Sequence, residues 1–309
     1  MNNRITGAVI VMNVISRLEN ADRPLIGVAW MLVTMFWFAS LDALAKYMMQ
    51  SYPVAQVVWA RFFFHVIFVL IAMGFSARLQ IRSQSIVLQC SRSLFMLTTT
   101  VLFFVGVHLL PLATAATIMF VSPIFVTILS IFLLKEHVGV RRWAGVAIGF
   151  AGAIVVVRPG FEDFDWSATF VLAAALTHAF YQIFTRKVRL YDSPMTSLFY
   201  TGLVGALVMT VVVPFHWQSV DVSDYFLLVS LGAAGGVGHL CLIRAFRSAP
   251  ASTVAPFSYT SLIWATMFGY VLFSDLPDRW TLIGACLIIS SGLYIFHRER
   301  VTRHNQGLT

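Results

Sequence analysis

Apolar residues fill most of this chain in long blocks, which short clusters of charged residues, proline and glycine separate. An α-helix needs about 20 predominantly apolar residues to cross a hydrocarbon core about 30 Å thick. Ten blocks approach that length, so the pattern predicts an all-α integral membrane protein with ten transmembrane helices. The blocks are residues 25–48, 54–74, 86–107, 112–134, 142–158, 166–185, 194–214, 223–243, 251–273 and 280–297.

The composition supports this interpretation. Soluble proteins have about 25% charged and about 45–50% apolar residues, whereas this chain has 11% charged and 59% hydrophobic residues. Its net charge of +8 could indicate nucleic acid binding, but the basic residues lie between apolar blocks and do not gather on a polar face. We therefore expect a lipid bilayer, and no nucleic acid, around the protein.

Lysine and arginine are distributed unequally between alternate loops. One side has only Arg158 and Arg279. Because cytoplasmic loops carry an excess of basic residues, the other side is predicted to be cytoplasmic, with both chain termini and an even number of spans. That side carries Arg4, Arg17, Arg23, Arg78, Arg82, Lys135, Arg141, Arg142, Arg186, Lys187, Arg189, Arg244, Arg247, Arg298, Arg300 and Arg303.

The first 23 residues contain an apolar run that is too short to cross a membrane and has no clear signal-peptide cleavage site. We expect residues 1–23 to form a cytoplasmic N-terminal segment and residues 299–309 a cytoplasmic tail. Met12 is an alternative start to Met1.

The chain also repeats itself. Residues 111–136, followed by Trp143 and Gly152, can be aligned with residues 250–275, followed by Trp280 and Gly292. The first copy begins on the outer side and the second on the inner side. This pattern predicts two inverted repeats of five helices, at 24–160 and 161–298, with a substrate site near the midplane where the repeats meet.

Several short motifs in both halves resemble the EamA domain of the drug/metabolite transporter superfamily. They are Leu112-Ala-Thr-Ala-Ala-Thr, Phe120-Val-Ser-Pro-Ile-Phe-Val, Leu134-Lys-Glu, Arg142-Trp-Ala-Gly, Gly238-His-Leu-Cys-Leu-Ile-Arg-Ala-Phe, Ala249-Pro-Ala-Ser-Thr-Val-Ala-Pro-Phe-Ser-Tyr and Ser261-Leu-Ile-Trp-Ala. The resemblance implies a multi-pass carrier of the cell inner membrane for a small metabolite. The second half is most similar to the riboflavin and S-adenosylmethionine subgroup.

Two arginines lie deep in apolar blocks, where charged groups are costly and therefore indicate function or a buried partner. Arg61 is roughly 12 Å from the outer end of its predicted helix and Arg92 about 10 Å from the cytoplasmic end of its own. The planar guanidinium of Arg61 suits a carboxylate or phosphate, and Arg92 is a candidate substrate or gate contact. The alternatives are a structural role for Arg61 and a side chain of Arg92 that reaches the interface.

Asp42 and Lys46 are four residues apart on one helix face, so they are predicted to pair. The pair is either an interfacial ion pair or a coupling site in which Asp42 takes up a proton. A proton is therefore the candidate coupling ion.

Polar and aromatic residues supply the other candidate substrate contacts. His178 and Gln182 are one turn apart, and His239 follows a glycine-rich stretch. Tyr259 and Trp264 lie about 13 and 20 Å into the ninth predicted helix and could stack on a planar substrate. Packing within the bundle is the alternative for each of these residues. No histidine pair has metal-ligand spacing, so we expect no metal and no cofactor.

Small and cyclic residues are expected to shape the cavity. Pro123, Pro250 and Pro256 interrupt predicted helices, and Gly236 permits close helix approach. We assign these four residues to hinges and cavity walls.

No phosphate-cradling glycine loop, G-x-S-x-G, H-E-x-x-H or Cys-x-x-Cys motif is found, so we expect no enzyme. The predicted function is secondary-active transport of a small polar or amphoteric metabolite, either riboflavin-like, amino-acid-like or opine-metallophore-like, by a monomer or homodimer. Export of a zwitterionic metallophore or amino acid is one alternative. A membrane metabolite sensor or an intramembrane enzyme are the alternatives from other classes.

Overall fold

The computed structural model describes residues 2–74, 81–135, 140–158 and 165–305, and this part of the chain is helical, with no strand. Each apolar block predicted from the sequence lies on one helix or on a broken helix. The elements are α1 Asn2–Met48, α2 Val54–Met73, α4 Ile86–Leu109, α5 Leu112–Met119, α6 Ser122–Leu134, α7 Val140–Val157, α8 Ser167–Val188, α9 Pro194–Val212, η2 Val213–His216, α10 Val222–Ser248, α11 Ala251–Val254, η3 Ala255–Thr260, α12 Ser261–Phe273 and α13 Arg279–Asn305.

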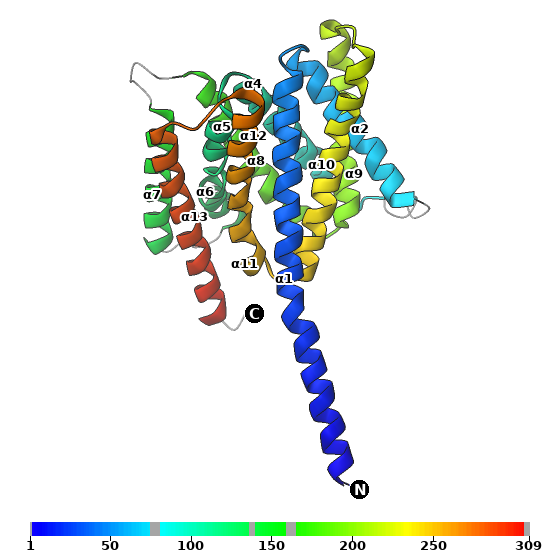
Figure 1. Cartoon of the computed structure of the whole chain (residues 1–309), viewed down its shortest axis with the longest axis vertical. Helices are drawn as coiled ribbons and strands as arrows, with labels where there is room; N and C mark the ends of the chain where they lie inside the picture. The colour runs from blue at the N-terminus through cyan, green and yellow to red at the C-terminus, as the bar shows by residue number, and fades with distance from the viewer. Residues whose placement is uncertain (1, 75–80, 136–139, 159–164, 306–309) are drawn as a thin grey trace.

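Within the described residues, seven helical segments are long and apolar enough to cross a membrane. They include Pro24–Met48 of α1 and the broken helix Leu112–Leu133. The apolar parts of α7 and α13, Trp143–Val157 and Arg279–Tyr294, are shorter. The helix α1 is continuous through Pro24, so the predicted N-terminal segment extends the first span as helix and projects from the bundle (Figure 1).

Two helices are broken at the prolines of the repeated motif. The first break separates α5 from α6, where Pro123 is in the first turn of α6. The second is the 3-10 turn η3, which has Pro256 in its first turn. Proline has no backbone N–H and disfavours a continuous helix, so the breaks lie where the sequence predicts them. Pro250 precedes the short helix α11.

The loops gather at two ends of the bundle. At one end Tyr52 Oη donates to Asp224 Oδ2 at 2.7 Å, and Lys46 Nζ donates to the Leu110 carbonyl at 2.7 Å. At the other end the backbone N–H of Gln84 donates to Asp192 Oδ1 at 2.8 Å. Both chain termini lie at this second end (Figure 1).

We call the first end the acidic end, after Asp165, Asp221, Asp224, Asp275 and Asp278. The second is the basic end, after Arg82, Lys135, Arg186, Lys187, Arg189, Arg244 and Arg247. The acidic and basic loop residues that the structure describes thus lie at opposite ends of the bundle, as the loop charges predict. Arg78 lies outside them.

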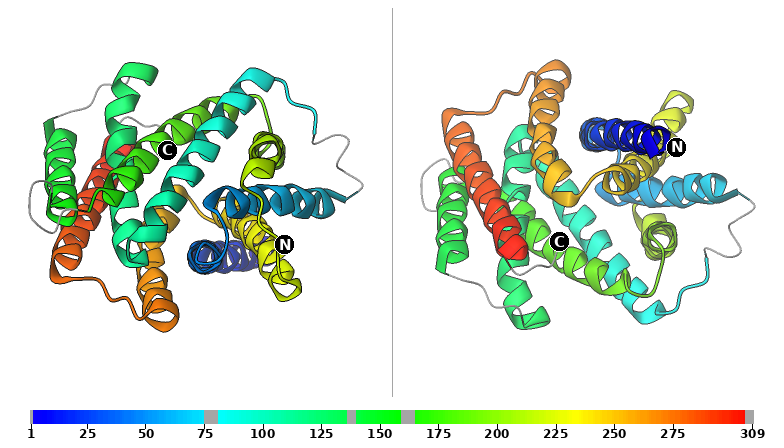
Figure 2. Two further views of the ribbon diagram at one scale, coloured as in Figure 1. Left: turned by 90° about the horizontal axis from the view of Figure 1, so that it is seen from above. Right: turned by 90° about the horizontal axis from the view of Figure 1, so that it is seen from below.

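Helix pairings occur in matched sets. The helix α1 packs on α10 and α12, while α8 packs on α4 and α6. Likewise α2 packs on α10 and α9 packs on α4. The pairs α2 with α9 and α7 with α13 join corresponding helices of the two halves, and Figure 2 shows α7 and α13 side by side. Each half therefore packs its first helix on the other half, as expected for a two-repeat protein.

Glycines bring α2 into close contact with α9 and α10. A Cβ atom on Gly205 of α9 would overlap the ring of Phe62. A Cβ atom on Gly232 or Gly236 of α10 would overlap Phe64 or Phe68, respectively. Small residues permit such close approach between membrane helices, and this packing positions the polar residues of α2 in the core.

Candidate functional site

Arg61 projects from the middle of α2 into the core. Its Nη1 atom donates to Thr100 Oγ1 of α4 at 2.8 Å. The guanidinium also lies 5.4 Å from the ring centroids of both Phe62 and Phe104. A guanidinium has five N–H donors, and this is the one hydrogen bond that Arg61 makes among the described residues. Arg61 is half-buried, so it retains donors for another group.

A small pocket opens beside this guanidinium. Its volume is about 10 Å³, which is close to the space that one water molecule needs. Four helices line it, two from each half of the chain. The lining residues are Arg61, Phe62 and His65 of α2, Met96 of α4, Thr201 of α9, and Gly235 and His239 of α10.

His65 is a residue of this pocket that the sequence analysis missed. It is one turn from Arg61 on α2, only 5% exposed, and its Nε2 atom has no hydrogen-bond partner in the described structure. The signal was present in the sequence, because residues four apart share a helix face and Arg61 was already a candidate. His239 is a candidate substrate contact from the sequence. Its ring centroid is 5.9 Å from the centroid of His65 and 4.9 Å from that of Phe38.

Arg92 lies behind the pocket and is 4% exposed. Its Nε donates to Thr185 at 2.8 Å, and its Nη1 donates to the Ser197 carbonyl at 2.9 Å. It also donates to Thr201 Oγ1 at 2.8 Å and Tyr181 Oη at 2.9 Å. Four of its five donors are therefore occupied by α8 and α9, which favours an anchoring role over substrate contact.

His178 and Gln182 form a second polar cluster at the break between α5 and α6. His178 Nδ1 is 3.2 Å from Ser122 Oγ, and Gln182 Nε2 is 3.3 Å from both of these atoms. The ring of His178 stacks on Tyr181 with centroids 5.6 Å apart. The two predicted residues thus lie together, as expected, and Ser122 completes their set.

The expected pair of Asp42 and Lys46 is not formed. Lys46 Nζ instead lies 3.2 Å from Asp275 Oδ2 and 5.0 Å from the ring centroid of Phe273. Lys46 lies on α1 near the acidic end of the bundle, and its long side chain reaches the loops at that end. Asp42 is half-buried and interacts electrostatically with Arg61. Both residues are described, and their charged atoms form no ion pair within 4.0 Å.

Tyr259 and Trp264 contact other aromatic residues and do not line the pocket. Tyr259 meets Phe120 edge to face, with centroids 4.9 Å apart. These two residues occupy equivalent positions in the repeated motif, so the two helix breaks meet there. Trp264 packs on Phe36 at 5.1 Å between centroids. Packing within the bundle accounts for both contacts.

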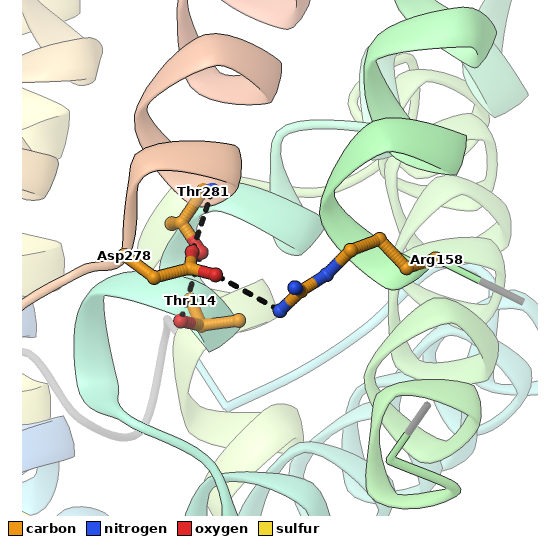
Figure 3. A network of polar contacts seen from close by, with 4 residues as sticks. All are labelled: Thr114, Arg158, Asp278 and Thr281. Carbon is orange, nitrogen blue, oxygen red and sulfur yellow. Dashed lines mark hydrogen bonds and ion pairs between the residues drawn. The ribbon is translucent and has the colours of Figure 1, made fainter. Parts of the chain in front are cut away.

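Polar contacts also join the two halves at the acidic end. Gln56 and the backbone of Gln218 exchange two hydrogen bonds of 3.0 Å. Arg158, which follows α7, pairs with Asp278 (Figure 3), with 2.9 Å between Arg158 Nη2 and Asp278 Oδ2. Asp278 Oδ1 also accepts from the backbone N–H of Thr281 at 2.8 Å. Burial opposes ionisation of Asp278, but Thr281 and Arg158 outweigh it and hold the pKa of this carboxyl below its usual value.

At the basic end one carboxylate joins the loop before α4 to the loop before α9. Asp192 accepts from Ser83 Oγ at 2.5 Å, from the Gln84 N–H at 2.8 Å and from Gln89 Nε2 at 2.8 Å. Burial raises the pKa of Asp192, but these hydrogen bonds outweigh that effect and hold the pKa below its usual value. Contacts between the two halves of the chain therefore lie at both ends of the bundle.

In the part of the chain that the structure describes, no three His, Cys, Asp or Glu side chains gather as a metal site. The polar groups of the core include the hydrogen-bond donors of Arg61, the carboxyl group of Asp42 and the histidines, and aromatic rings surround them. Such a site can bind a small polar molecule through charge and hydrogen bonds.

Comparison with known proteins gives matches in both halves. Residues 25–158 and 165–296 each match the EamA-like transporter family. An S-adenosylmethionine uptake transporter of Rickettsia felis is 29% identical over 276 residues, which cover 89% of this chain and 94% of that protein. A riboflavin transporter of Vibrio cholerae is 27% identical over 290 residues, with 89% and 94% covered.

A pseudopaline exporter of Pseudomonas aeruginosa is 24% identical over 268 residues, which cover 85% of this chain and 93% of that protein. One solved crystal structure with 18% identity has a TM-score of 0.60 and covers 89% of this chain and 96% of its own chain, which shows a shared fold. The resemblance noted in the sequence motifs is confirmed by these matches.

Proposed function

This chain belongs to the EamA-like transporter family and is a multi-pass membrane protein, and we propose that it is a secondary-active carrier of a small polar or amphoteric metabolite. The observation that carries the proposal is the pocket at Arg61, which both halves of the chain line. A site between the two repeats is where secondary transporters bind substrate. The names of the relatives support a metabolite as the cargo.

The proposed mechanism is alternating access between two inverted five-helix repeats, residues 24–160 and 161–298. Lys46 and Asp275 come from different repeats and close the acidic end. Gln89 and Asp192 also come from different repeats and close the basic end. Separation at one end while the other stays closed would expose the pocket to one side of the membrane at a time. The excess of basic residues supports a cytoplasmic location for the basic end, for residues 1–23 and for residues 299–309.

The direction of transport has two candidates, because the relatives include both an uptake transporter and an exporter. The proposal covers riboflavin-like, amino-acid-like and opine-metallophore-like substrates, with a proton as the coupling ion at Asp42. A sensor that binds a metabolite without moving it is the candidate from another class.

Counterflow in proteoliposomes tests the carrier proposal. Vesicles loaded with unlabelled metabolite should accumulate the labelled compound transiently, because a carrier exchanges substrate across the membrane. A receptor would bind the labelled compound without this exchange. An intramembrane enzyme would instead release a chemically altered product.

A further inference from the structure

The polar side chains beside Arg61 have hydrogen-bonding capacity that the protein does not use. Arg61 uses one of its five N–H donors, in its bond to Thr100, and buried His65 has an unpartnered Nε2 atom. His239 is half-buried and makes no hydrogen bond among the described residues. Buried polar groups in proteins are almost always paired, so this cluster points to a bound group that supplies the missing hydrogen-bond partners.

The charges around the pocket select an anion. Arg61 is the only charged residue among the residues that line it, and Arg92 donates to the lining residue Thr201 from behind. A cationic group in the pocket would be repelled by Arg61, the charged lining residue. Asp42 interacts with Arg61 but is not a lining residue and forms no ion pair with it, so the guanidinium fork is free to bind a carboxylate through paired hydrogen bonds.

The helix packing holds His65 in place. A Cβ atom on Gly202 of α9 would lie 2.8 Å from His65 Cδ2, and one on Gly235 of α10 would lie 3.5 Å from His65 Nδ1. The ring is thus confined by both helices, and His65 is one of the residues that line the pocket. The volume of about 10 Å³ is too small for a metabolite, so the substrate enters when the repeats separate.

We propose that Arg61, His65 and His239 form a subsite for the carboxylate of the substrate, so that the cargo is an amphoteric carboxylate compound and not a neutral flavin. This inference rests on the proposed carrier function and narrows its substrate class. It assigns His65 a role in substrate binding.

Binding by the purified full-length protein in nanodiscs tests the proposal, with matched probes that differ in a single carboxylate. One pair is S-adenosylmethionine and its decarboxylated form, a second is tryptophan and tryptamine, and riboflavin is the neutral probe. We expect at least one carboxylate probe to bind about tenfold or more tighter than its matched amine, because a hydrogen bond to a charged group is stronger than a neutral one.

Variants assign that preference to the pocket. Arg61→Gln and His65→Leu should bind the two members of a pair with similar affinity, while His65→Gln, which keeps a donor, should retain part of the preference. His216→Gln, at an exposed histidine outside the pocket, should behave as wild type. Size-exclusion profiles and melting temperatures show whether each variant is folded, and Arg61→Lys, which keeps the charge, replaces Arg61→Gln if the latter is not.

The proposal is overturned if no carboxylate probe binds to wild-type protein, if riboflavin binds as tightly as any of them, or if folded pocket variants keep the full preference. Counterflow separates the two claims. Exchange of substrates that lack a carboxylate would refute the subsite and leave the carrier intact. Carboxylate-selective binding without any exchange would refute the carrier and leave the subsite intact.

Discussion

Lys46 Nζ lies 3.2 Å from Asp275 Oδ2 and 2.7 Å from the carbonyl oxygen of Leu110, so a single buried ammonium joins α1 to the segment before α5 and to the loop after α12 at the acidic end. Asp275 is 35% exposed in its side chain while Lys46 is 9% exposed. The ion pair is therefore partly screened, and the hydrogen bond to the carbonyl is the better protected contact. This arrangement makes Lys46 the side chain whose loss should loosen the acidic end most directly.

Replacement of Lys46 by methionine should increase access to the pocket from the acidic side. About 1 kcal/mol of lost contact corresponds to a change of about fivefold in an equilibrium between closed and open forms. The measurement is the labelling rate of a Met96→Cys reporter by a membrane-impermeant maleimide, in a background in which Cys90, Cys241 and Cys286 are alanine. Arg189→Gln at the basic end is the matched control, and equal rates in the Lys46 variant and wild type would contradict this role.

Asp192 should make the stability of the basic end depend on pH. Its hydrogen bonds lower the pKa of its carboxyl in the folded protein. The resulting stabilisation is present above the unfolded-state pKa, about 3.9, and is lost as the pH falls through the lower folded value. Melting curves from pH 3 to 7 should show this loss in wild-type protein and a weaker dependence in Asp192→Asn.

At pH 7 the Asp192→Asn variant should be destabilised by about 1–3 kcal/mol, because it weakens hydrogen bonds to a charged group. Asp221→Asn provides the comparison, since Asp221 is exposed at the acidic end. If both variants melt alike at every pH, the carboxylate of Asp192 has no stabilising role.

Arg92→Gln should reduce stability more than selectivity. The substitution removes most of four hydrogen bonds to α8 and α9, and breaking such a buried network costs several kcal/mol, about 3–5. Thermal unfolding in nanodiscs measures the loss. Protein that remains folded at low temperature should keep its preference for carboxylate probes. A variant of normal stability without that preference would instead make Arg92 a substrate contact.

Asp42→Asn should abolish the dependence of transport on a proton gradient, because the amide cannot take up a proton. Asp42 is half-buried and its electrostatic partner is Arg61, which places it where substrate binding and protonation can influence each other. Uptake into proteoliposomes with and without an imposed gradient measures the effect. An unchanged gradient dependence would leave Asp42 with a structural role.

The sequence was sufficient to predict what depends on local pattern. The apolar blocks predicted the helices, the prolines at 123 and 256 predicted the breaks, and the loop charges predicted the two ends. These features follow from hydrophobicity and backbone geometry within a few turns of helix.

Contacts between distant segments could not be predicted in the same way. Asp42 and Lys46 share a helix face, but the carbonyl of Leu110 and the carboxylate of Asp275 are 64 and 229 residues from Lys46 in the chain and compete for its ammonium. Arg92 was a candidate substrate contact until its partners on α8 and α9 were known. The position of His65 one turn from Arg61 was readable from the sequence, but its confinement by glycines of α9 and α10 was not, because those glycines are far away in the chain.

Counterflow with a carboxylate-bearing metabolite is the most direct test of the central claim that this chain carries a substrate bound at Arg61. Proteoliposomes with wild-type protein or with His216→Gln should exchange labelled S-adenosylmethionine, or whichever carboxylate probe binds tightest, for the unlabelled compound. Vesicles with Arg61→Gln should show no exchange above empty vesicles. The absence of exchange by wild-type protein, or equally rapid exchange by folded Arg61→Gln, would contradict the account.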